Sequence, residues 1–220
     1  MRKKLNLGCG QIRPKGWINT DSSINSFIQK MPFGGMISKS LGLKQYDSKN
    51  MTYMNLNKRW SSLKNDSIGI VYASHLFEHL SIKSRTIFLN EAFRTLAKGG
   101  VIRLVVPDMA AHAKEYIENY HKLSDTEPAR QFMWVLNLHR EGQYPNDRRM
   151  HNFIGRLQEY PHQHKFMYDK YSLGALFKKH GFSKINVSSF GQSHYIKEIV
   201  DVEFDIKKSY DNSLYIEAIK

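Results

Sequence analysis

A glycine turn followed by a carboxylate is the first candidate for chemistry in this sequence. The turn, Gly8-Cys9-Gly10, directly follows the alternating apolar segment 4–7, and Asp21 closes the segment 17–21. Glycines after a first strand let the backbone approach a ligand closely, and a carboxylate at the end of the next strand can accept hydrogen bonds from two ribose hydroxyls. The alternative is a plain tight turn, with Asp21 as a turn or helix-cap residue.

A polar cluster follows the buried apolar run 67–73. Ser74 and His75 come first, and Glu78 and His79 follow. Histidine can accept a proton near neutral pH, and residues four apart can share one face of a helix. The two histidines are therefore candidates for a general base. The alternative is that they brace a helix through Glu78.

Histidine and arginine are also frequent between residues 139 and 165. The segment holds His139, His151, His162 and His164, with Arg140, Arg148, Arg149 and Arg156. Three interpretations stay open: a solvated loop, a metal site, or a substrate site in which arginine binds phosphate or carboxylate and His164 serves as a base. Because His162-x-His164 is a weak metal spacing with no evident third ligand, we predict no metal site.

The elements that must position these residues alternate between strand and helix patterns. We expect strands at 4–7, 17–21, 51–56, 67–73, 101–106, 183–190 and 213–219, and helices at 85–97, 110–122 and 170–180, the first ended by Gly99-Gly100. This alternation predicts a three-layer open α/β sheet with helices on both faces, mostly parallel, in which the fourth strand lies beside the first. The last two strands have no helix between them, so they should pair antiparallel and place one antiparallel strand at an edge. Residues 24–43 favour one or two short covering helices, with an amphipathic membrane-touching segment as the alternative.

In this order and spacing the motifs resemble the class I S-adenosylmethionine (SAM)-dependent methyltransferases. The pattern is that of a small branch with Leu-Asn-Leu-Gly-Cys-Gly, Gly-Trp-x-Asn-x-Asp, Ser-His-x-x-Glu-His-Leu and Gly-Gly in succession, and it covers residues 4–108. It resumes at 164–169 and 213–218. The resemblance implies a Rossmann-like fold and SAM as the cofactor, with S-adenosylhomocysteine as the product.

The resemblance also implies roles for single residues. Gly8, Cys9 and Gly10 would line the methionine and ribose parts of the cofactor, Asp21 would hold the ribose hydroxyls, Asn55 and Leu56 would flank the adenine, and Ser74 would contact the methionine end. Asn6 and Asn55 stand where the family usually has acids. Asparagine accepts a hydrogen bond without charge assistance, so it should bind more weakly. The segment between Gly8 and Asp21 is also short, which favours a turn over the usual first helix.

The implied reaction is methyl transfer, with O-methylation of a small-molecule or glycan-type acceptor as the leading hypothesis. A hydroxyl acceptor needs a base, for which His75, His79 and His164 are the candidates. Two alternatives stay open: an RNA methyltransferase or RNA-binding protein, and a catalytically silent methyltransferase-like binding subunit.

Composition limits the remaining possibilities. The 220 residues fit a single domain, with a substrate-lid insertion expected at about 123–165. The net charge is +13, of which residues 1–65 carry +10 (12 Lys and Arg against two Asp). Such a basic third can face nucleic acid, but no RNA-binding motif accompanies it, so RNA is not favoured. One cysteine excludes an intrachain disulfide, and we expect a cytoplasmic protein with no transmembrane segment and no signal-peptide core.

Overall fold

A seven-stranded sheet organises the protein. The computed structural model describes residues 2–22, 28, 31–40, 50–120, 132, 136, 164–203 and 212–220. The strands are β1 (Lys3–Leu7), β2 (Trp17–Asp21), β3 (Thr52–Tyr53), β4 (Ile68–Ser74), β5 (Leu96–Pro107), β6 (Ser183–Ser188) and β7 (Ser213–Ile219), in the spatial order β3-β2-β1-β4-β5-β7-β6. The pairs from β3 to β5 are all parallel. Strand β7 runs antiparallel to both β5 and β6, which confirms the predicted Rossmann-like α/β fold and its reversed strand.

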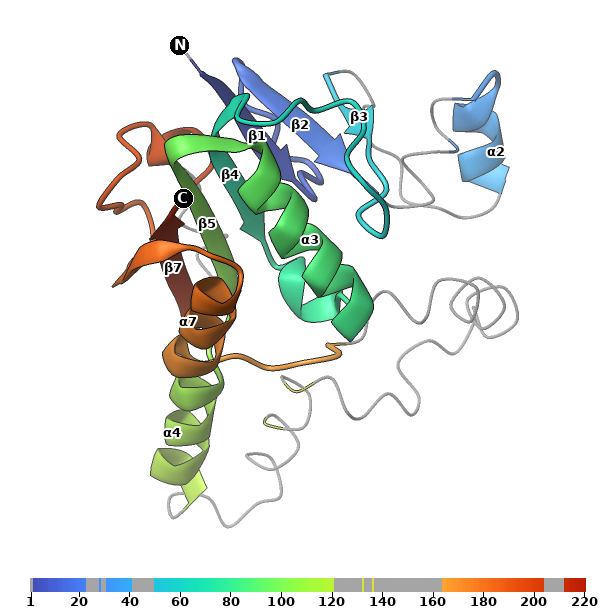
Figure 1. Ribbon diagram of the computed structural model, residues 1–220. Helices are drawn as coiled ribbons and strands as arrows, with labels where there is room; N and C mark the ends of the chain where they lie inside the picture. The colour runs from blue at the N-terminus through green and yellow to red at the C-terminus, as the bar shows by residue number, and fades with distance from the viewer. Residues whose placement is uncertain are drawn as a thin grey trace.

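Two helices cover one face of the sheet. Helix α3 (Ile82–Thr95) and helix α7 (Lys170–Lys179) both lie in front of the sheet in Figure 1. Leu5, Val71 and Ile216 point to this face, where they join Phe88 of α3 and Phe177 of α7 in the main core. Every second residue of a strand faces the same side, so these alternating apolar positions explain how the sequence directs both helices to one face.

The opposite face is covered by the connection between β6 and β7. Ile196, Ile199 and Val202 of this connection pack on Tyr72 and Tyr215 of the sheet. Among the described residues the connection contains a single 3-10 turn, η2 (Ile199–Asp201), and no α-helix. No helix lies between β1 and β2 either, as the short segment predicted, because residues 8–16 form turns. Because residues 8–16 form only a short turn, no helix covers this face of the sheet there, and the β6–β7 connection packs on it instead.

Several element boundaries differ from the sequence prediction. Helix α3 ends at Thr95, and Gly99-Gly100 lies inside β5 instead of ending the helix. There the register shifts between Ile68–Leu96 and Ile70–Val101, so extra residues of β5 bulge out. A Cβ on Gly100 would lie 2.8 Å from the carbonyl oxygen of Ala97, which explains the glycine in the bulge. The predicted strand 51–56 is reduced to Thr52–Tyr53.

The other two helices that the structure describes lie away from the sheet (Figure 1). Helix α4 (Met109–Tyr120) follows β5 and has no fully buried residue, and it projects below the sheet in Figure 1. Helix α2 (Gly34–Ser40) lies within the helical region predicted at 24–43, of which residues 28 and 31–40 are described. No helix among the described residues is long and apolar enough to cross a membrane. Apart from residues 132, 136, 164 and 165, the predicted lid at 123–165 lies outside the described residues, as do His139, His151 and His162.

Candidate functional site

The carboxyl ends of the parallel strands meet at one edge of the sheet. From β1 the chain continues to β2 on one side, while β4 pairs with β1 on the other, so the strand order reverses between β1 and β4. Ligands of open α/β sheets bind in the crevice outside such a reversal. Because β7 is reversed, its first residue, Ser213, also reaches this edge, where it pairs with Pro107.

A cavity of about 360 Å³ opens at this reversal. Six of the predicted site residues line it: Asn6, Gly8, Cys9, Gly10, Ser74 and His75. The sequence analysis did not identify the other lining residues, which are Gln11, Ile12, Tyr72, Phe190, Val202, Glu203 and Tyr215. The cavity therefore lies between the glycine turn and the connection that covers this face.

The glycine turn is held in a left-handed conformation. Gly8 has φ +65° and Gly10 has φ +50°. A Cβ on Gly8 would lie 3.1 Å from Leu76, whereas a Cβ on Gly10 would meet no atom within 4 Å. Glycine is therefore required at the first position by space as well as by φ. At the second position, its absent side chain leaves the backbone open to a ligand.

Asn6 braces the turn from below. Its Nδ2 donates to the carbonyl oxygen of Ile12 at 2.9 Å and to Oδ1 of Asn19 at 3.1 Å. Both amide hydrogens are thereby used, so Oδ1 is the part of this side chain that can accept a hydrogen bond from a ligand. Asn6 thus has a structural role that its sequence position did not predict. Its Oδ1 can still serve as the predicted hydrogen-bond acceptor.

Cys9 lies at the centre of the turn, next to the end of β2. Its backbone N–H donates to the carbonyl oxygen of Thr20 at 2.9 Å, and its side chain is 5% exposed. Burial, together with the nearby Asp21 carboxylate, raises the pKa of the Cys9 thiol to about 11. Asp21 is partly buried at the end of β2, beside the turn. It is not among the residues that line the cavity, so its role at the ribose stays a prediction.

Asn55 and Leu56 lie apart from the cavity. The Oδ1 of Asn55 accepts a hydrogen bond from the backbone N–H of Asn57 at 2.9 Å, which closes a local turn after β3. Leu56 is buried in the main core. Neither residue is among those that line the cavity, so their assignment to the adenine stays a prediction.

His75 is the one predicted base that lines the cavity. It adopts φ +48°, and its backbone N–H donates to the carbonyl oxygen of Val105 at 2.9 Å. Its Nε2 lies 3.3 Å from Oγ of Ser213, and its Nδ1 lies 3.4 Å from Oε1 of Glu78. The ring is therefore oriented through both nitrogens, by β7 on one side and by a buried carboxylate on the other.

His79 and His164 meet at the same carboxylate. Nε2 of His79 lies 3.8 Å from Oε1 of Glu78, and the His79 and His164 rings are 4.9 Å apart between centroids. The structure thus brings all three predicted histidines around Glu78, which the sequence offered only as a brace in the alternative to a base role. The 3-10 turn η1 (Phe77–His79) presents Glu78 and His79 together.

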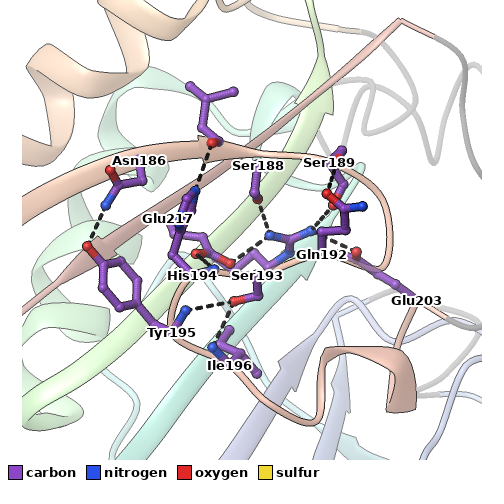
Figure 2. Close-up of polar contacts among 12 residues, drawn as sticks. Asn186, Ser188, Ser189, Gln192, Ser193, His194, Tyr195, Ile196, Glu203 and Glu217 are labelled. Atoms are coloured by element: carbon purple, nitrogen blue, oxygen red, sulfur yellow. Dashed lines mark hydrogen bonds and ion pairs between the residues drawn. The ribbon is translucent and has the colours of Figure 1, made fainter.

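A buried ion cluster lies next to the cavity, which one of its members, Glu203, lines. Arg103 donates to both oxygens of Glu203, at 2.8 and 2.7 Å, and to Oε1 of Glu217 at 2.7 Å. Figure 2 shows Ser188, Glu203 and Glu217 converging on this guanidinium group. With both carboxylates ionised, two negative charges against one positive leave the cluster with a net charge of −1. The signal for it in the sequence was a charged residue inside each of two apolar strands, at positions that pair in the sheet.

Comparison with solved structures gives the class of fold. A SAM-dependent methyltransferase from Thermotoga maritima, a possible histamine N-methyltransferase, is 16% identical and superposes over 100% of this chain and 83% of its own, with a TM-score of 0.50. SAM-dependent methyltransferases from Archaeoglobus fulgidus (14% identity, 100% and 86% coverage, TM-score 0.47) and Aquifex aeolicus (12%, 99% and 81%, 0.45) are also similar.

At these identities the likeness defines the fold, which is the Rossmann-like fold of SAM-dependent methyltransferases. No protein-family model matches the sequence, and no curated protein does.

Proposed function

We propose that the protein is a SAM-dependent methyltransferase that acts on a hydroxyl group of a small-molecule or glycan-type acceptor. The observation that carries this proposal is the position of the cavity, which lies at the reversal of strand order and is bordered by the glycine turn. Its residues also suit the cofactor. The backbone at Gly10 is open, Asn6 offers an acceptor for an ammonium group, and the adjacent cluster of net charge −1 favours a cationic ligand.

The residues of this chain would divide the work of binding. When bound, SAM supplies a methyl group on a positively charged sulfur, which is already a strong electrophile. Gly8, Cys9 and Gly10 would hold the cofactor through the backbone, and Ser74 would face its methionine end. Asp21 would accept hydrogen bonds from the ribose hydroxyls. Holding an acceptor in line with the methyl group lowers the entropic part of the barrier.

His75 would accept the proton of the acceptor hydroxyl. A hydrogen on Nδ1 would face the Glu78 carboxylate 3.4 Å away, so Nε2 would be the basic nitrogen. Among the three candidate histidines, His75 alone lines the cavity, which favours it over His79 and His164 as the base. The methyl group would move from sulfur to oxygen, the hydroxyl proton would move to His75, and S-adenosylhomocysteine would leave.

The test uses methyl transfer from radiolabelled SAM to a panel of acceptors, with sugars and nucleotide sugars first. We expect turnover with the wild-type protein, and we expect His75→Gln to reduce it by about 10²- to 10⁴-fold, the usual contribution of a general base. His180→Gln is the matched control, because His180 ends α7 next to the opposite edge of the sheet. Equal turnover by the wild type and His75→Gln would contradict the role of His75.

A catalytically silent binding subunit is the second candidate. One observation favours it: the asparagines at positions 6 and 55 both have local partners, where the resembling family usually has acids. This candidate predicts cofactor binding without turnover on any acceptor in the same panel.

A further inference from the structure

Glu78 is a buried carboxylate with little to compensate its charge. It is fully buried, and neither side-chain oxygen has a hydrogen-bond partner among the described residues. Ring nitrogens of His75 and His79, which carry a positive charge only when protonated, lie 3.4 and 3.8 Å from its Oε1. Buried carboxylates are normally paired, hydrogen-bonded or bound to a metal ion, because removing them from water is costly. The site therefore points to a missing positive partner.

A distant part of the chain brings His164 to this carboxylate. The backbone N–H groups of Lys165 and Phe166 donate to the carbonyl oxygen of Glu78, at 2.8 and 3.3 Å. Two residues further on, the ring of Tyr168 packs on Phe77 with a centroid distance of 5.3 Å. The position of His164 is therefore fixed by the contacts that the residues after it make with Phe77 and Glu78.

Glu78, His79 and His164 together form a set of metal-ligating atoms. One such atom from each of the three residues lies within 4.8 Å of the others. Ligands about 2.0–2.2 Å from a metal ion lie roughly 3–3.5 Å apart in tetrahedral geometry, so an approach of about 1 Å by the side chains closes the site. Two imidazoles and one carboxylate suit zinc and similar divalent ions, whereas magnesium and calcium prefer oxygen ligands alone.

We propose that Glu78, His79 and His164 bind one divalent transition metal ion, with Zn²⁺ as the best match to the ligand set. Three protein ligands leave a coordination position open, as is usual where zinc takes part in a reaction. The site adjoins the cavity, because His75, which lines the cavity, faces the same carboxylate oxygen. Donation from His75 Nδ1 to the Glu78 carboxylate would orient this ligand from the side of the cavity.

The test is a metal titration that uses no methyl donor, so its outcome is independent of the proposed function. Untagged protein is first treated with a chelator. It is then titrated with Zn²⁺ by calorimetry and with Co²⁺ by visible absorption, which reports coordination by nitrogen and oxygen. We expect one ion per chain and a rise in the thermal unfolding midpoint with Zn²⁺.

Two variants decide whether the ion binds at this place. His164→Gln and Glu78→Gln should each weaken binding by at least about 10- to 100-fold, the range that loss of an outer-sphere partner already produces. His180→Gln should leave binding unchanged. His164 is partly exposed, so its variant should fold even if Glu78→Gln does not. Absence of saturable binding, or affinity that is unchanged in His164→Gln, would overturn the proposal.

Discussion

At the scale of single residues, the glycine turn gives Cys9 an unusual environment. The thiol is nearly inaccessible, and the Asp21 carboxylate lies close enough to oppose its ionisation. Only the thiolate is nucleophilic, so a thiol with a raised pKa is inert. Cys9 therefore serves the site through its backbone and its small apolar volume.

Cys9 should react slowly with alkylating reagents. Raising the pKa from 9.0 to about 11 lowers the thiolate fraction at pH 8 by about 100-fold, and burial slows the reaction further. Iodoacetamide labelling followed by mass spectrometry should show a rate at least about 100-fold below that of an exposed cysteine in a peptide. Labelling at the rate of the peptide would contradict the burial and charge environment described here.

Sequence reasoning identified the cavity-lining residues that end or directly follow a strand, and it missed those that depend on long-range packing. Gly8, Ser74 and His75 end buried parallel strands, and the carboxyl ends of such strands meet at one edge. Glu203 and Tyr215 come from the β6–β7 connection and the reversed strand, whose placement over the first strands no local pattern reveals. No local pattern connects Glu78 with His164 either, because the two residues are far apart in the sequence.

At the scale of elements, the β6–β7 connection takes the place of a helix on one face of the sheet. It is anchored by Asp201, whose Oδ2 accepts hydrogen bonds from Nε1 of Trp17 and from Nζ of Lys4, both at 3.1 Å. These bonds join the cover of the cavity to β1 and β2. The order of the strands was predictable from their alternation with helices, but this cover was not, because its apolar residues follow no regular period.

Asp201 should stabilise the fold in a manner that depends on pH. The hydrogen bond from Trp17, helped by Lys4 and partly opposed by burial, holds the pKa of Asp201 below its usual value. A lowered native pKa stabilises the fold above the unfolded-state pKa of about 3.9, and the effect is lost as the pH falls through the native value. Because this carboxylate is 36% exposed, solvent screening limits the effect to about 0.5–1 kcal/mol.

Urea unfolding of wild type and Asp201→Asn at several pH values measures this contribution. The difference in unfolding free energy should be full at pH 7 and should shrink as the pH falls below about 4. A difference that is constant down to the acid limit would show that the carboxylate charge plays no part.

At the scale of the whole molecule, one buried arginine links the sheet to the β6–β7 connection that covers one of its faces. Arg103 in β5 joins Glu217 in β7 and Glu203 in the connection, and all three side chains are at most 2% exposed. Its loss would leave two carboxylates buried without a cation, and breaking such a buried pair destabilises a protein by about 3–5 kcal/mol.

Arg103→Met should therefore lower the unfolding free energy by about 3–5 kcal/mol, as measured by urea denaturation. The matched control is Lys114→Met, which removes one partner of the exposed Lys114–Glu118 pair and should change stability by less than about 1 kcal/mol. Equal effects of the two substitutions would show that the buried cluster does not hold the cover to the sheet.

The central claim is that the cavity at the reversal of strand order binds SAM. Calorimetric titration of the wild-type protein, Asp21→Ala and the control Asp66→Ala with SAM and S-adenosylhomocysteine tests it most directly. Asp66 precedes β4 at the opposite edge of the sheet, where it pairs with Lys220. We predict micromolar binding by the wild type and the control. A hydrogen bond to a charged group contributes about 1.5–3 kcal/mol. Asp21→Ala should therefore bind SAM about 10- to 150-fold more weakly than the wild type. Absence of binding to the wild type would contradict the claim, and unchanged affinity in Asp21→Ala would remove that residue from the site.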